Sequence, residues 1–171
     1  CTLRAFRRGQ GRPPGAQLPL GGAGSQETAL RQLVGELRLN NVTFAGRVPP
    51  EDIWRYYADA DIYLQTPNID NMPASVLEAF SSGCPVVATE AGGVPAILTH
   101  DLHGLLVPCN DHEAAAAAML RLLDDPALAR RLADAAFDSC ARYQWSSVRA
   151  QWVALYHRLV RPRALAAPNP A

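Results

Sequence analysis

Two carboxylates stand eight positions apart in the stretch NIDNMPASVLEAF, at residues 68–80. Asp70 precedes Pro73 and Glu78 follows it. Proline is favoured in the first turn of a helix, where its missing N–H costs nothing, so Glu78 is expected on a helix about 8 Å beyond the helix start. The free N–H groups of that start can bind a phosphate, and a carboxylate on each side can accept hydrogen bonds from paired hydroxyl groups. A nucleotide diphosphate sugar carries these groups in this order.

The surrounding apolar pattern predicts the elements that hold the two carboxylates. Apolar residues alternate between strand-like and helical spacing, which is typical of an α/β domain with a parallel sheet. Pro19 cannot donate to a sheet ladder, so its strand is expected to be an edge strand or irregular. Asp70 and Asn71 would lie in the loop after a parallel strand, where open α/β sheets bind ligands. Strands are expected at residues 17–20, 42–45, 61–65, 85–88 and 104–107, and helices at 27–38, 50–59 and from residue 73.

The chain is expected to be wholly helical after the last of these strands. Asn110 and the acid three residues later fit a capping box, Asp125-Pro126 fits a second helix start, and a third helix is expected near Trp145. The connections are too short for a linker between domains. We therefore expect one domain at residues 1–160, followed by a disordered tail at 161–171. The last helix is expected to carry an apolar stripe made of Val148, Trp152, Leu155, Tyr156 and Leu159.

The composition excludes several classes of function. The 16 basic residues balance 16 acidic ones, so no basic footprint indicates a nucleic-acid partner. All basic residues are Arg, which excludes a lysine Schiff base and hence an internal pyridoxal-phosphate linkage. The four cysteines form no C-x-x-C pair, which indicates reduced thiols and a cytoplasmic protein. No window approaches the roughly 18 apolar residues of a membrane span.

Three other patterns imitate metal or cofactor sites and are interpreted as structural. Asp59-Ala60-Asp61 imitates a D-x-D metal motif, but a helix end followed by a strand start would point the two side chains apart. His100 and His103 have no third ligand nearby. The loop at residues 21–27 imitates a G-x-G-x-x-G motif, yet Glu27 stands where the third glycine belongs and would repel a pyrophosphate. A metal centre and a dehydrogenase are therefore both disfavoured.

The order and spacing of residues along most of the chain resemble a known family. The segment DNMPASVLEAFSSGCPVVATEAGGVPAIL, with NVTFAGRVPPEDIWRYYADADIYL before it and HGLLVPCNDHEA after it, is similar to the C-terminal, donor-binding domain of retaining GT-B glycosyltransferases of family 4, the glycosyl transferases group 1. The resemblance runs from about Leu3 to Leu159. It implies a Rossmann-like, doubly wound parallel sheet that forms one half of a GT-B fold. Residues 1–8 match the first helix of that domain, so the first strand and its diphosphate-binding loop are expected to be missing.

The resemblance also implies roles for individual residues. Family members carry two glutamates with seven residues between them, of which the first binds the sugar hydroxyls and the second the ribose of the donor. The matching positions here are Asp70 and Glu78, the expected catalytic pair. Asp70 is one methylene shorter than the commoner Glu, so the loop must approach the sugar more closely or Asn71 must share the contact. Further donor-binding positions implied by the resemblance are Arg47 and Val48 beside the base, Asn71, Met72 and Ala74 around the sugar and phosphates, and Gly92 and Gly93.

The resemblance implies transfer of a glycosyl group from a nucleotide diphosphate sugar, with retention and without a required metal or other cofactor. The acceptor would be a glycan or lipid in bacterial polysaccharide or glycoconjugate biosynthesis. A missing N-terminal acceptor domain would complete the site and could place the protein at the inner membrane, so this fragment alone is expected to be inactive. Two alternatives stay open, namely a GT-B nucleotide-sugar epimerase and a non-catalytic sugar-nucleotide binding module.

Overall fold

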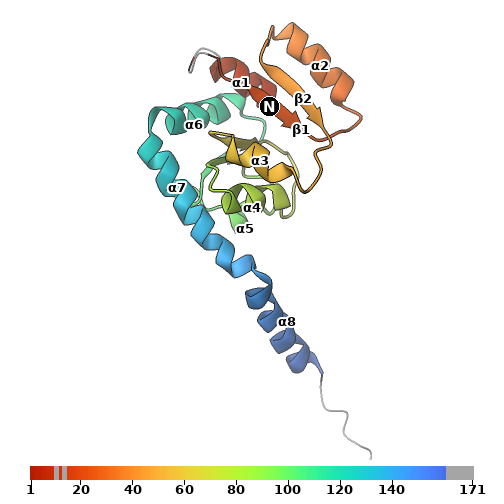
Figure 1. Ribbon diagram of the computed structural model, residues 1–171, viewed down its shortest axis with the longest axis vertical. Coiled ribbons are helices and arrows are strands. Elements are labelled where there is room, and N and C mark those ends of the chain that lie inside the picture. Colours follow the sequence, from red (N-terminus) through yellow and green to blue (C-terminus); the bar gives the residue numbers. More distant parts are fainter. Residues whose placement is uncertain (10–11, 13–14, 161–171) are drawn as a thin grey trace, which may run out of the picture.

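The computed structural model describes residues 1–9, 12 and 15–160 (Figure 1). All five strands expected from the sequence are present, each within two residues of its expected bounds. The tail expected to be disordered, at 161–171, lies outside the described residues. In chain order the elements are α1 (Thr2–Gly9), β1 (Leu18–Gly21), α2 (Glu27–Glu36), β2 (Val42–Gly46), α3 (Ile53–Ala58), β3 (Tyr63–Gln65), α4 (Ala74–Ser81), β4 (Val86–Thr89), α5 (Val94–Ile97), β5 (Leu105–Val107), α6 (His112–Asp124), α7 (Pro126–Ser139), the 3₁₀ helix η1 (Cys140–Tyr143) and α8 (Trp145–Leu159).

The strands form two sheets, and every neighbouring pair is parallel, as predicted. β1 pairs with β2, and β4 lies between β3 and β5. Within the described residues β1 has one strand neighbour, so one of its edges is unpaired. The N–H of Leu18 donates to the carbonyl of Asn41 in front of β2 at 2.8 Å. Pro19 therefore faces the unpaired edge, because successive residues of a strand point their N–H groups to opposite sides, and this confirms the edge position expected for it.

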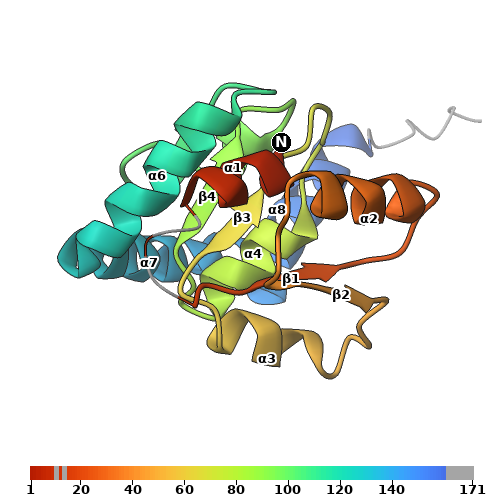
Figure 2. The ribbon, with the colours of Figure 1, turned by 90° about the horizontal axis from the view of Figure 1, so that it is seen from above.

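Helices cover both faces of the β3–β4–β5 sheet, which confirms the doubly wound arrangement (Figure 2). All four residues of β4 are buried, and successive side chains enter different clusters because a strand alternates its side chains. Val87 packs with Ala5 of α1 and Leu122 of α6. Val86 packs on the opposite face with Phe80 of α4 and with α5. The core therefore consists of two apolar layers separated by β4.

α1 connects the two sheets. Its Leu3 and Phe6 belong to a cluster with the β1–β2 sheet and α2, whereas its Ala5 belongs to the cluster around β4 and α6. At the start of the helix, the hydroxyls of Thr2 and Thr66 form a hydrogen bond of 2.7 Å. Because Thr66 directly follows β3, this contact joins α1 to the edge of the second sheet.

The helix starts after β5 agree with the sequence pattern except for one cap. α6 is capped by Asp111 and not by Asn110, because Asp111 Oδ1 accepts two N–H groups of the first turn at 3.0 and 2.8 Å. Asn110 has a φ of 63°, a left-handed conformation that Asn tolerates better than most residues, and it forms the turn into the cap. α7 begins as expected, with Asp125 Oδ1 accepting an N–H at 2.9 Å and Pro126 in the first turn.

α8 begins at the expected residue and extends away from the body of the domain (Figure 1). None of its residues is buried, so the apolar stripe expected on it does not pack against the described core. Trp152 and Tyr156 stack on each other with ring centroids 5.7 Å apart, and both are exposed. The apolar residues of the last helix are therefore left uncovered in the described part of the chain.

Phe80 and Phe137 provide a matched test of the core. Phe80 is fully buried between α4 and β4, whereas Phe137 on α7 is 55% exposed. We expect Phe80→Ala to lower the free energy of unfolding by about 3–5 kcal/mol, because it removes a large apolar side chain and leaves a cavity. Phe137→Ala should cost less than about 1 kcal/mol. Urea denaturation followed by circular dichroism measures both, and equal losses would contradict this description of the core.

Candidate functional site

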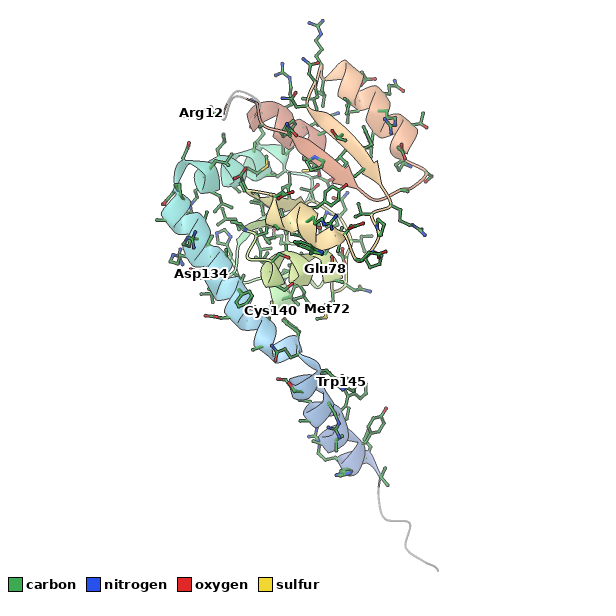
Figure 3. All side chains as sticks on the ribbon, in the orientation of Figure 1. Arg12, Met72, Glu78, Asp134, Cys140 and Trp145 are labelled. Atoms are coloured by element: carbon green, nitrogen blue, oxygen red, sulfur yellow. The ribbon has the colours of Figure 1, made fainter. Side chains whose placement is uncertain are left out.

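The two carboxylates predicted to act together lie on consecutive segments after β3. Asp70 is half-buried in the loop between β3 and α4. Glu78 is exposed on α4, where Figure 3 labels it. α4 begins at Ala74, and Pro73 is its N-cap residue with φ −66° and ψ 114°. Proline therefore stands just before the first turn. The sequence pattern had suggested a place within that turn. No side chain caps this helix start, so its first N–H groups are available to an anion.

Each carboxylate accepts one hydrogen bond from a neutral side chain. The Gln65 amide at the end of β3 donates from Nε2 to Asp70 Oδ2 at 3.2 Å. The Tyr57 hydroxyl of α3 donates to Glu78 Oε2 at 2.9 Å. Within the described residues the other carboxylate oxygens, Asp70 Oδ1 and Glu78 Oε1, have no hydrogen-bond partner. Gln65 Oε1 is buried and also lacks a partner there, so the amide is oriented by its contact with Asp70.

Neither donor was predicted. Tyr57 lies 21 positions before Glu78 and on a different element, so no local spacing connects the two residues. The polar Gln65 at the end of the apolar run IYLQ was the only available signal for its role. Burial raises the pKa of the Tyr57 phenol, and the hydrogen bond to Glu78 raises it further. The hydroxyl therefore keeps its proton at neutral pH and acts as a donor.

Gly92 and Gly93 lie in the loop after β4, directly against the loop that carries Asp70. The N–H of Gly93 donates to the carbonyl of Asp70 at 2.9 Å. A Cβ atom at Gly92 would overlap the Asp70 carbonyl oxygen, and one at Gly93 would overlap the carbonyl of Asn71. Gly92 also has a φ of 50°, which disfavours a side chain. The two glycines thus position the carboxylate loop by close backbone contact, a role that the sequence did not reveal.

Arg47 and Val48 line an open cleft of about 330 Å³ beside the end of β2. Tyr56 contributes to the same cleft from α3, next to the Tyr57 that contacts Glu78. Arg55 and Asp52 form an ion pair of 3.2 Å in its wall. The lining residues are Ala45, Arg47, Val48, Pro49, Asp52, Arg55 and Tyr56. A second open cleft, along α8, contains none of the residues expected at the site.

The predicted site residues therefore occupy the segments that follow three strands. Arg47 and Val48 follow β2, Asp70, Asn71 and Met72 follow β3, and the two glycines follow β4. Met72 is 52% exposed, and Ala74 opens α4. The Asp70–Asn71 and Gly92–Gly93 segments are in direct contact. The segments after β3 and β4 emerge from the carboxyl edge of one parallel sheet, where ligands bind in open α/β folds, and the segment after β2 emerges from the carboxyl edge of the other sheet.

The two histidines interpreted as structural serve as hydrogen-bond acceptors for backbone N–H groups. Nδ1 of His100 accepts the N–H of Leu106 at 3.0 Å, and Nδ1 of His103 accepts the N–H of Thr99 at 3.3 Å. Asp59 caps the end of α3, whereas Asp61 lies just before β3. In the part of the chain that the structure describes, no three His, Cys, Asp or Glu side chains gather as a metal site. No helix in that part combines the length and apolar character needed to cross a membrane.

Curated relatives of known name align with most of this chain. An exopolysaccharide phosphotransferase of Streptomyces coelicolor is 34% identical over 165 residues, which are 95% of this chain and 17% of the relative. A D-inositol 3-phosphate glycosyltransferase of Corynebacterium urealyticum is 34% identical over 142 residues, which are 82% of this chain and 34% of the relative. The chain thus spans only about a sixth to a third of the length of these relatives.

Solved structures share the fold. Anabaena HepE in complex with UDP-glucose superposes with a TM-score of 0.81 at 24% identity, over 91% of this chain and 44% of that one. The C-terminal domain of a group 1 glycosyl transferase from Francisella tularensis superposes with a TM-score of 0.75 at 23% identity, over 84% of this chain and 78% of that domain. The family model of the glycosyl transferases group 1 matches residues 2–139. The chain therefore belongs to this glycosyltransferase family, and its fold is that of the C-terminal half of the GT-B glycosyltransferases.

Proposed function

We propose that this chain is the donor-binding domain of a retaining glycosyltransferase that uses a nucleotide diphosphate sugar. The observation that carries the proposal is the pair of carboxylates on either side of the uncapped start of α4. Asp70 and Glu78 each have one oxygen held by a neutral donor and another without a partner in the described chain. Free carboxylate oxygens on both sides of an anion site suit a ligand with a central phosphate and hydroxyls at both ends.

The donor would lie across the segments that follow β2, β3 and β4. Glu78 would accept the ribose hydroxyls, and Asp70 with Asn71 would accept the hydroxyls of the transferred sugar. The diphosphate would lie at the N–H groups of α4, and the base would enter the cleft lined by Arg47 and Val48. A structure with the same fold is a complex with UDP-glucose, which supports a nucleotide sugar as the class of donor.

Transfer would proceed on one face of the sugar, with no nucleophile supplied by these residues. Asp70 would orient the anomeric carbon by holding the sugar hydroxyls, since a carboxylate binds paired hydroxyls well. The positive end of the α4 dipole would stabilise the negative charge that develops on the departing diphosphate. The acceptor site, and the basic side chains that complete the diphosphate site, would belong to a part of the protein outside this sequence. This scheme requires no metal.

The proposal includes a cytoplasmic enzyme of bacterial polysaccharide or glycoconjugate synthesis. None of the four cysteines forms a disulfide, which fits a reducing compartment.

A second candidate is a sugar-nucleotide binding module without activity of its own. The chain matches only 17% of a relative named a phosphotransferase, so a domain like this one is a small part of a protein named for another reaction. A third is a nucleotide-sugar epimerase. Release of nucleoside diphosphate only with an acceptor supports transfer, whereas sugar interconversion without acceptor supports the epimerase.

Glu78→Ala tests the ribose contact in the complete polypeptide that contains these residues. The affinity for the nucleoside diphosphate should fall about tenfold or more, because two charge-assisted hydrogen bonds to the ribose are lost. Titration calorimetry measures the Kd. Glu36→Ala, which changes an exposed glutamate on α2, serves as the matched control and should leave the Kd unchanged. An unaltered Kd in Glu78→Ala would remove Glu78 from the donor site.

Asp70→Asn tests the sugar contact. Turnover should fall by about tenfold or more while the Kd of the free nucleoside diphosphate stays nearly constant, because Asp70 would contact only the transferred sugar. Steady-state kinetics and calorimetry on the same preparation separate the two effects. Asp59→Asn at the exposed end of α3 is the control. Equal losses of turnover and nucleotide affinity would instead indicate that Asp70 only maintains the loop.

Gly93→Ala tests the contact between the two loops. An added methyl group would overlap the Asn71 carbonyl, so the carboxylate loop must move and donor turnover should fall by about tenfold or more. Gly35→Ala on α2 is the control, because a Cβ atom there meets nothing within 4 Å. Turnover is assayed with thermal unfolding in parallel. Full activity in Gly93→Ala would show that the position of Asp70 does not depend on this contact.

A further inference from the structure

The hydroxyl of Tyr57 is the one side-chain group in the described chain that forms a hydrogen bond with the carboxylate of Glu78. Tyr57 lies on α3 and is only 7% exposed, whereas Glu78 is exposed. The hydrogen bond between the hydroxyl and Glu78 Oε2 is 2.9 Å long. The ring of Tyr57 is thus buried in an apolar cluster, while its hydroxyl contacts the carboxylate proposed to bind ribose.

The ring of Tyr57 has little freedom to move. Its edge packs against the Tyr63 ring with centroids 5.3 Å apart and an interplanar angle of 79°. It also belongs to the core cluster that contains Val76 and Phe80 of α4, the helix that carries Glu78. Because α3 and α4 share this cluster, their packing limits movement of the hydroxyl relative to the backbone of Glu78. The hydrogen bond can therefore hold the carboxylate in one rotamer.

We propose that Tyr57 is a positioning residue for ribose recognition, which holds Glu78 Oε2 so that Oε1 is presented to the ribose hydroxyls. This inference rests on the proposed function. An exposed glutamate samples many rotamers, and fixing it in advance reduces the entropy lost when the ligand binds. A neutral donor suits this role, because a cation would compete with the ribose for the carboxylate. Tyr56, the preceding residue on α3, lines the cleft proposed for the base, so α3 would set the geometry of base and ribose together.

The test uses Tyr57→Phe, which keeps the buried ring and removes only the hydroxyl. The complete polypeptide is first titrated with UDP and with GDP, and the nucleotide that binds more tightly becomes the probe, together with its 2′,3′-dideoxy form. The original protein should bind the ribose form more tightly than the dideoxy form. Tyr57→Phe should weaken binding of the ribose form about fivefold and leave the dideoxy form nearly unchanged. A merely structural role would weaken both.

Glu78→Ala and the double variant separate the inference from the proposed function. Glu78→Ala should abolish the preference for ribose, and Tyr57→Phe should then have no additional effect, because the hydroxyl acts through Glu78. Tyr143→Phe, on η1 and packed against the same apolar cluster as Tyr57, is the matched control for loss of a phenol. Equal weakening of both nucleotide forms by Tyr57→Phe, or no weakening while Glu78→Ala does weaken binding, would overturn the role of Tyr57 alone. Unchanged affinity in Glu78→Ala would overturn the proposed function of Glu78 as well.

Discussion

Complete burial of β4 is the constraint on which the rest of the domain depends. Val87 enters the layer with α1 and α6, and Val86 enters the layer with α4 and α5. A shift of one residue in strand pairing would exchange the two faces, so the register of β3, β4 and β5 is strongly specified. Thr89 at the end of β4 donates its hydroxyl to the carbonyl of Pro67, just after β3. The ends of the two strands are therefore held together, and so are the loops that follow them.

The site is built from backbone contacts before any ligand group is placed. The glycine pair after β4 touches the backbone of Asp70 and Asn71 at a separation that leaves no room for Cβ atoms. The carboxylates are then held by neutral donors, and neither forms an ion pair within the described residues. No cation of the described chain therefore competes with ligand hydroxyls for either carboxylate. This arrangement distinguishes a carboxylate kept for hydroxyl recognition from one used in a structural salt bridge.

The two carboxylates are held by different parts of the structure. Glu78 is tied through Tyr57 to α3 and hence to the cleft beside Arg47, so the part proposed for base and ribose lies wholly within this chain. Asp70 is tied to the end of β3 by Gln65 and lies in a loop with exposed neighbours. The chain spans 44% of a solved structure with its fold. Under the proposed function, the sugar and its acceptor would be enclosed by residues that this sequence does not include.

Local patterns in the sequence determined the elements and the spacing of the carboxylates. Strand positions, the starts of α7 and α8, and the register of Glu78 behind Asp70 depend on hydrophobic period and turn chemistry within about ten residues. The same rules misplaced the α6 cap by one residue, since Asn110 and Asp111 are both good caps and only the left-handed φ of Asn110 decides between them. Tertiary structure alone decided the contacts of Tyr57 with Glu78 and of Gly93 with Asn71, and the exposure of the α8 stripe. Residues more than 20 positions apart meet only because strand pairing and helix packing bring their elements together, and no local spacing records such a meeting.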